Sequence, residues 1–212
     1  MTGNTLRQDF TELNHGFLGL ATSGLEVGLR PSVQERIASL GEQGLHALAG
    51  LPFALFGLGF EEEGAWATLL SPCVRDLEPA YAAARAPAER FTLLALSTLR
   101  THLRLVPEPV SAWIGLPPPM RSQLVAVEIS LLAPVAACAA PRLRARRVLR
   151  EAVWLRLVEA AAGRDRRQLA LLAAWGRQWS IRRSLGLNQV RAGSRAFRRC
   201  KRALSGAGER TC

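Results

Sequence analysis

Apolar residues recur at the spacing of an α-helix along nearly the whole chain, and this periodicity limits the folds that the chain can adopt. The N-terminal segment shows it clearly, with apolar side chains at Leu13, Phe17, Leu18, Leu20 and Ala21. No run alternates apolar and polar residues convincingly, and Val and Ile are sparse beside Leu and Ala, which disfavours a large sheet. With 212 residues, 49% of them apolar, the chain can bury a core. The sequence therefore predicts an all-α protein.

Local signals mark where several helices begin. Ser32 and Glu35 have the spacing of a capping box, in which each side chain bonds an amide at the helix start. Pro87 is typical of the first turn of a helix, where proline loses no hydrogen bond. Prolines 117–119 precede another helix, predicted from about Met120.

The longest uncharged stretch runs from Gln43 to Phe60, close to the shortest length that spans a membrane. It contains Pro52, His46 and four glycines. These residues favour a buried helix, a turn and a second buried helix, with a spanning helix as the alternative. We expect no membrane insertion.

The sequence contains an internal repeat. Residues 28–50 align with residues 115–137 at a constant offset of 87 and without a gap. The identical residues are Gly28, Leu29, Pro31, Leu45 and Ala49, against Gly115, Leu116, Pro118, Leu132 and Ala136. Trp66 also meets Trp154 after a shift of one residue. The alternative is that two Ala- and Leu-rich helical segments align by composition, but the shared proline start and the matched tryptophans favour duplication.

Duplication predicts two helical units in tandem, over residues 1–85 and 86–165, followed by a basic C-terminal segment over residues 166–212. We expect the last segment to be helical to about Leu187 and flexible beyond it. Two copies in one chain form a fused pseudo-dimer, the covalent counterpart of a symmetric association. The predicted state is therefore a monomeric pseudo-dimer or a hetero-oligomer.

Residues 6–21 read LRQDFTELNHGFLGLA. They are similar to the opening helix of the flagellar transcriptional activator FlhD family, whose pattern is D-x-x-E-L-N-x-x-[FY]-L-x-L-A. The matching positions are Asp9, Glu12, Leu13, Asn14, Phe17, Leu18, Leu20 and Ala21. Residues 55–71 resemble the family's segment of a phenylalanine, two acids, a tryptophan and two leucines. The resemblance covers about residues 5–75 and, more weakly, 91–160.

The resemblance implies a small helical protein that dimerises and acts with a second protein, FlhC, to activate promoters of flagellar operons. In that family FlhC supplies the zinc-binding part and much of the DNA contact, and the cysteines of this chain do not match its zinc pattern. Three departures stand out. The chain is about twice the family's typical length, the spacer after the first helix is shorter, and the family's bridging cysteine falls near Phe56, so no such bridge is expected.

Positive charge is concentrated in the last third of the chain. Residues 1–141 carry 9 basic and 13 acidic side chains, whereas residues 142–212 carry 19 basic and 4 acidic ones. Such asymmetry favours a partner that offers phosphate, in nucleic acid or on an anionic membrane. A solvated surface is the alternative.

Arginine suits phosphate because its planar guanidinium donates paired hydrogen bonds and stays charged. We interpret residues 142–150 as helical, which places Arg142, Arg146 and Arg150 on one face. Trp175 and Trp179 are interpreted as packing residues, with base stacking as the alternative. The candidate DNA-binding residues are Arg142, Arg144, Arg146, Arg147, Arg150, Arg177, Arg182, Arg183, Arg198 and Arg199.

Signals for catalysis are weak. His15, His46 and His102 lie far apart in the sequence, and none has a partner at metal-ligand spacing. The acidic run at residues 61–63 is interpreted as a solvated turn or the first turn of a helix. No phosphate-binding glycine loop and no CxxC pair occurs. We expect no enzyme activity, no cofactor and a reduced, cytoplasmic protein.

The favoured function is transcription regulation, as a subunit of an activator complex that binds DNA directly or with an FlhC-like partner. The systems it would control are flagellar or related operons. The alternative is a non-enzymatic docking component of a secretion or motility apparatus. Steeply salt-dependent DNA binding would favour the first function.

Overall fold

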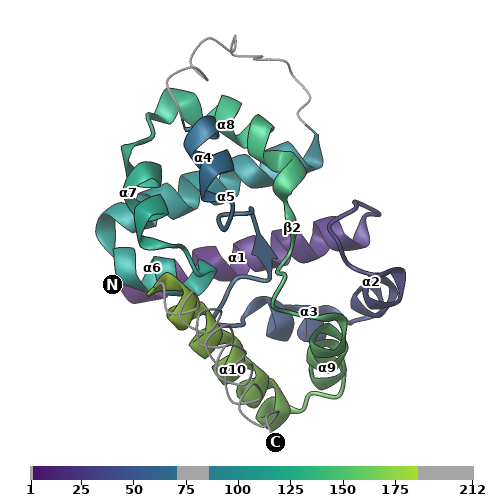
Figure 1. Ribbon diagram of the computed structural model, residues 1–212. Coiled ribbons are helices and arrows are strands. Elements are labelled where there is room, and N and C mark those ends of the chain that lie inside the picture. Colours follow the sequence, from purple (N-terminus) through teal and green to yellow (C-terminus); the bar gives the residue numbers. More distant parts are fainter. Residues whose placement is uncertain (1, 71–85, 186–212) are drawn as a thin grey trace, which may run out of the picture.

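The computed structural model describes residues 2–70 and 86–185, which fold into ten α-helices and one two-stranded antiparallel sheet (Figure 1). The helices are α1 (Thr2–Thr22), α2 (Pro31–Ala38), α3 (Glu42–Ala49), α4 (Glu63–Leu69), α5 (Pro87–Leu105), α6 (Pro107–Ile114), α7 (Pro118–Ala126), α8 (Leu132–Ala139), α9 (Glu151–Ala162) and α10 (Arg166–Ser184). The strands are β1 (Phe56–Gly57) and β2 (Arg144–Ala145), and the 3₁₀ turns are η2 (Ile129–Leu131) and η3 (Ala140–Arg142). The prediction of an all-α protein is confirmed.

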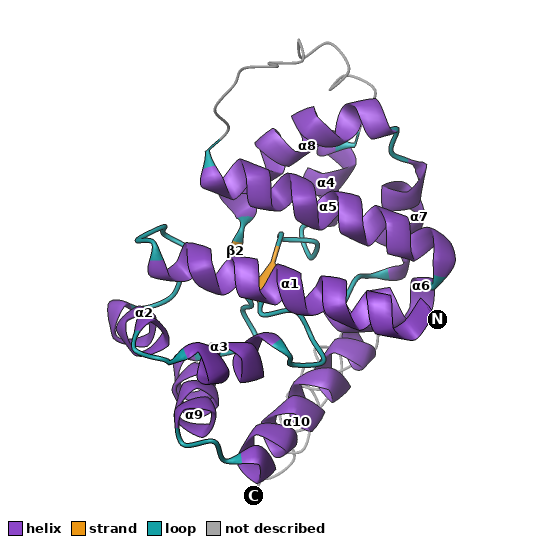
Figure 2. Cartoon of the chain, turned by 180° about the vertical axis from the view of Figure 1, so that it is seen from behind, coloured by secondary structure: helices purple, strands orange, loops and turns teal. Residues whose placement is uncertain are grey.

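Helix α1 runs through the middle of the molecule (Figure 2). It packs against α5 on one side, and α5 in turn contacts α7 and α8. On the other side α1 packs against α2 and α3, which both contact α9. Helix α10 packs against α6 and α9.

One apolar core joins the two segments that duplication predicts as units. Helix α4, from the first segment, packs on α8, and α9, from the second, packs on α2 and α3. The two strands cross the same division, with Phe56 opposite Ala145. Trp66 and Trp154 are both fully buried. The two segments therefore interlock, each covering part of the other's apolar surface.

The aligned repeat segments begin with the same local geometry. Helices α2 and α7 start at Pro31 and Pro118, which are equivalent positions of the repeat. The glycine three residues before each start has a left-handed backbone, with φ of 72° at Gly28 and 70° at Gly115. Glycine adopts this conformation readily because it has no Cβ.

The structure confirms two of the three predicted helix starts. Helix α5 begins at Pro87 as predicted, and α7 begins at Pro118, two residues before the predicted position. The prediction of a capping box at Ser32 is wrong. The residue that precedes α2 is Arg30, whose side chain makes no capping bond, because Pro31 occupies the first helical position.

The stretch from Gln43 to Phe60 forms one helix, α3, and not the predicted two. Residues 50–60 are irregular apart from β1, although the side chains from Phe53 to Phe56 are at most 1% exposed. Buried backbone groups outside a helix need other partners. The amide of Asn14 supplies several, donating to the carbonyls of Ala49 and Phe53 and accepting from the amide of Leu55.

Helix α10 is attached to the body through small residues. Its buried positions are Gly176, Ser180 and Ser184, so the helix lies close to its neighbours, while Leu171 and Trp175 are exposed. A Cβ built at Gly176 would lie 2.3 Å from a ring carbon of Phe53. The helix continues to Ser184, near the predicted end, and the flexible tail predicted after Leu187 lies outside the described residues.

Within residues 2–70 and 86–185, no single helix is both long and apolar enough to cross a membrane. Helix α7 and the segment Ile129–Arg142 reach the required length and apolarity only as a pair, bent by 104°.

Candidate functional site

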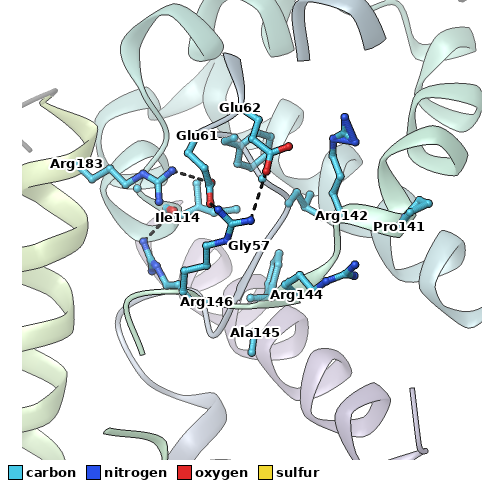
Figure 3. A pocket seen from close by; sticks show the side chains of 16 residues that line it. Gly57, Glu61, Glu62, Ile114, Pro141, Arg142, Arg144, Ala145, Arg146 and Arg183 are labelled. Carbon is cyan, nitrogen blue, oxygen red and sulfur yellow. Dashed lines mark hydrogen bonds and ion pairs between the residues drawn. The ribbon is translucent and has the colours of Figure 1, made fainter. Parts of the chain in front are cut away.

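Five of the predicted arginines line one cavity of about 220 Å³ (Figure 3). The loop from Phe56 to Glu62 forms one wall, and the segment from Pro141 to Arg147 forms another. The end of α6 and Arg183 of α10 complete it. The lining arginines are Arg142, Arg144, Arg146, Arg147 and Arg183.

The segment that carries the first five arginines is not the predicted helix. Arg142 ends η3, Arg144 lies in β2, and the next helix, α9, begins only at Glu151. Arg142, Arg146 and Arg150 therefore do not share a helical face. The segment is extended because β2 pairs with β1 and because Leu143 and Ala145 are buried on alternate positions.

Arg146 is a core residue, with only 4% of its surface exposed. Its guanidinium donates to the carbonyls of Ala54 at 3.0 Å, Trp113 at 3.2 Å and Ile114 at 2.9 Å. Burial and, to a smaller degree, the nearby charge of Arg183 lower the pKa of Arg146 to about 9, and the charge of Glu61 opposes them. The prediction that Arg146 contacts DNA is wrong, because its donors are engaged inside the protein.

Arg183 and Arg147 pair with carboxylates of the predicted acidic turn. Arg183 donates to Glu61 at 2.8 Å, and Arg147 lies 3.7 Å from Glu61 and 3.5 Å from Glu62. Glu63 opens α4, as the interpretation of a helical first turn requires. The other two acids are counter-ions of arginines that lie 85 or more residues away in the sequence, which sequence reasoning missed.

The pKa of Glu61 lies below its ordinary value. Burial opposes ionisation, but the hydrogen bond from Arg183, a backbone hydrogen bond and the charges of Arg183 and Arg147 outweigh it. The ionised form is therefore stabilised in the folded protein more than in the unfolded chain.

We expect Glu61→Gln to lower the free energy of unfolding at pH 7, by about 1 kcal/mol or less because the pair is partly solvated. A lowered pKa gives stability that is present above the ordinary carboxyl pKa and is lost as pH falls through the folded value. Urea unfolding at about pH 7 and about pH 3.5 should therefore show the variant's deficit shrinking in acid. Glu35→Gln is the control, since Glu35 is exposed and has no ion-pair partner among the described residues. A deficit that is the same at both pH values would contradict the prediction.

The remaining candidates are distributed over two regions. Arg144, Arg147 and Arg150 are exposed around β2 and the start of α9, and Arg177 and Arg182 are exposed on α10. Arg142 is half-buried. Arg198 and Arg199 lie outside the described residues.

The two tryptophans of α10 have different surroundings. The ring of Trp179 lies 5.3 Å from the guanidinium carbon of Arg146 and 5.5 Å from that of Arg183, so the packing interpretation holds for it. Trp175 is 41% exposed, and the packing interpretation is wrong there. The helix presents this residue to solvent because its small residues face the body.

The three histidines do not form a site. His15 and His46 are exposed, while His102 is largely buried and lies 2.6 Å from a carboxylate oxygen of Asp9. In the described part of the chain, no group of three or more His, Cys, Asp or Glu residues is arranged to hold a metal ion.

No protein-family model matches the sequence, and no curated protein or solved structure matches it either.

Proposed function

We propose that the protein is a non-enzymatic regulator of transcription that binds the phosphate backbone of nucleic acid through α10. The observation that carries this proposal is the outward display of arginines on that helix. Arg166, Arg167, Arg177 and Arg182 are all exposed. Sequence reasoning singled out two of these four as DNA contacts, and the packing of α10 adds Arg166 and Arg167.

The charge of this surface is uncompensated. Residues 166–184 contain no Asp or Glu, and the acid before them, Asp165, accepts the backbone amide of Gln168 at the helix start. No ion pair involves the four outward arginines among the residues that the structure describes. Four solvated guanidinium groups on one helix would displace condensed counterions from DNA.

The proposed architecture is a tandem, FlhD-like pair of units that exchange their last helices. Three features support it: the equivalent left-handed glycines Gly28 and Gly115, the buried Trp66 and Trp154, and the packing of α4 on α8 and of α9 on α3. Such a pseudo-dimer would act in the cytoplasm, alone or with an FlhC-like partner, on flagellar or related operons.

Replacement of Arg166, Arg167, Arg177 and Arg182 by alanine tests the proposal. If all four contact phosphates, the slope of log affinity against log salt should become shallower by about three to four units. Affinity for unrelated duplexes should fall to a similar degree, because phosphate contacts do not read sequence. Fluorescence anisotropy at several salt concentrations measures both effects.

The matched control removes the same number of charges elsewhere, by replacing Arg30, Arg36, Arg104 and Arg121 with alanine. Three of these are already paired, with Glu151, Glu159 and Glu108. An equal change of slope in both quadruple variants would assign the effect to net charge and would reject α10 as the contact surface.

A docking role is the second candidate function, and the outer face of α10 favours it as well. Three of its large apolar residues, Leu171, Trp175 and Ile181, and Leu185, which follows the helix, are 67%, 41%, 36% and 61% exposed. Apolar side chains that together form a contiguous exposed patch often mark a protein interface. If the protein has this docking role, the double substitution Leu171→Ser and Leu185→Ser should abolish co-purification with secretion or motility components. It should leave DNA affinity unchanged.

A further inference from the structure

We propose that the arginine-lined cavity is a binding site for a phosphate group, either the free ion or a phosphate monoester. This inference concerns a small ligand held in a cavity that opens on the surface beside β2. It is independent of the nucleic-acid surface on α10.

The cavity holds more positive charge than its own carboxylates balance. Five arginines line it, against the two carboxylates of Glu61 and Glu62. Arg183 and Arg147 engage these two carboxylates, and Arg146 donates to backbone carbonyls. Arg144 donates only to the carbonyl of Leu143, at 2.8 Å. Arg144 and Arg142 thus have no ion-pair partner among the described residues, which leaves a formal excess of positive charge.

Arg142 carries the specific signal. Its Nε atom is buried and has no hydrogen-bond partner within the described residues. In Figure 3 dashed lines join Arg183 to Glu61 and Arg146 to Ile114, while none reaches Arg142. A buried N–H without an acceptor is costly. Nε is not open to the cavity as it stands, so the Arg142 side chain would turn to donate to an anion there.

The surroundings fix the side chain of Arg142 beside the cavity. Its aliphatic carbons lie over Gly59, where a Cβ would be 3.6 Å from Cδ of Arg142. Gly59 has a φ of 70°, so its backbone conformation favours glycine. The aliphatic part of Arg142 and Gly59 therefore lie side by side in the lining of the cavity, and residue 59 adds no Cβ there.

Size and charge select the ligand class. A water molecule occupies about 30 Å³ in the liquid, so a cavity of about 220 Å³ accommodates a tetrahedral oxyanion and part of an attached group. A phosphate carries about two negative charges and several acceptor oxygens. It therefore matches two arginines without counter-ions better than a ligand with a single carboxylate would. Guanidinium forks bind phosphate through paired hydrogen bonds.

Isothermal titration calorimetry of the full chain at constant ionic strength tests the site, with inorganic phosphate and adenosine monophosphate as probes and chloride as the baseline. We expect Arg142→Ala to weaken phosphate binding about tenfold or more, since paired charge-assisted bonds are lost. Arg142→Gln keeps part of the stem and should weaken binding comparably. Arg150→Ala, which removes one exposed charge outside the cavity, should leave binding unchanged.

The two probes distinguish the free phosphate ion from a phosphate monoester as the ligand. Tighter binding of inorganic phosphate assigns the free ion, and tighter binding of adenosine monophosphate assigns an ester. Glu62→Gln removes a competing carboxylate and should strengthen binding several-fold. Failure of the wild-type chain to bind either probe at about 10 mM overturns the inference. Equal binding by wild type, Arg142→Ala and Arg142→Gln also overturns it, and none of these outcomes depends on DNA affinity.

Discussion

Replacing Arg146 by alanine is expected to lower the free energy of unfolding by about 3–5 kcal/mol. The substitution leaves a cavity in the core and removes the donors that now reach the carbonyl oxygens of Ala54 and Ile114. Arg146→Met fills most of the volume but supplies no donor, so its loss should be smaller, about 1–3 kcal/mol. Urea unfolding followed by tryptophan fluorescence measures both variants.

Arg147→Ala is the matched control, because it changes the neighbouring arginine in the same sequence context. The Arg147 side chain is 71% exposed, and its ion pairs with glutamates are therefore worth about 1 kcal/mol or less. If Arg146→Ala proves no less stable than Arg147→Ala, the core role of Arg146 is refuted and the residue returns to the set of surface candidates.

Gly176→Ala is expected to lower the free energy of unfolding by about 2–3 kcal/mol, although alanine is the better helix former by about 1 kcal/mol. The reason is steric. The added Cβ would lie 2.3 Å from Cε1 and 2.6 Å from Cζ of the Phe53 ring, and Phe53 is only 1% exposed. Relief requires α10 to move away from the body. Hydrogen exchange should accordingly show faster exchange of α10 amides.

Gly19→Ala, in another helix, is expected to raise the free energy of unfolding. Gly19 lies inside α1, and a Cβ there would meet no atom within 4 Å. This variant should gain up to about 1 kcal/mol from helix propensity alone. Stabilisation by both glycine substitutions would show that α10 does not approach Phe53 as closely as the structure has it.

The arginine cluster shows how far sequence reasoning reaches at the site. Composition indicated that the region after Pro141 carries the positive charge, and five of the ten predicted residues do line one cavity. Composition could not separate Arg146 from Arg147, which are adjacent and chemically identical. Arg146 is buried because its guanidinium reaches the carbonyls of Ala54, Trp113 and Ile114, whereas Arg147 lies in the turn after β2 and is exposed.

The sequence gives a partial indication that the acidic residues 61 and 62 pair with arginines. Their run of like charge stands out against a neutral surrounding segment, and the arginines are the only large excess of opposite charge. Pairing them with Arg147 required the antiparallel contact of β1 with β2, and pairing Glu61 with Arg183 required the packing of α10 on α6. Local periodicity contains no information about such a contact.

The sequence by itself determined the helical class, the start of α5 at Pro87 and the aligned positions from which α2 and α7 begin. Each of these follows from local chemistry: apolar spacing, the fixed φ of proline and the freedom of glycine. Only the tertiary structure decided that residues 50–60 are not a helix, that Arg146 is buried and that α10 presents four of its five arginines outward. These outcomes depend on distant partners, namely the amide of Asn14, the carbonyls of Ala54 and Ile114, and the ring of Phe53 against Gly176. Long-range packing and the pairing of buried polar groups override local preference when the two conflict.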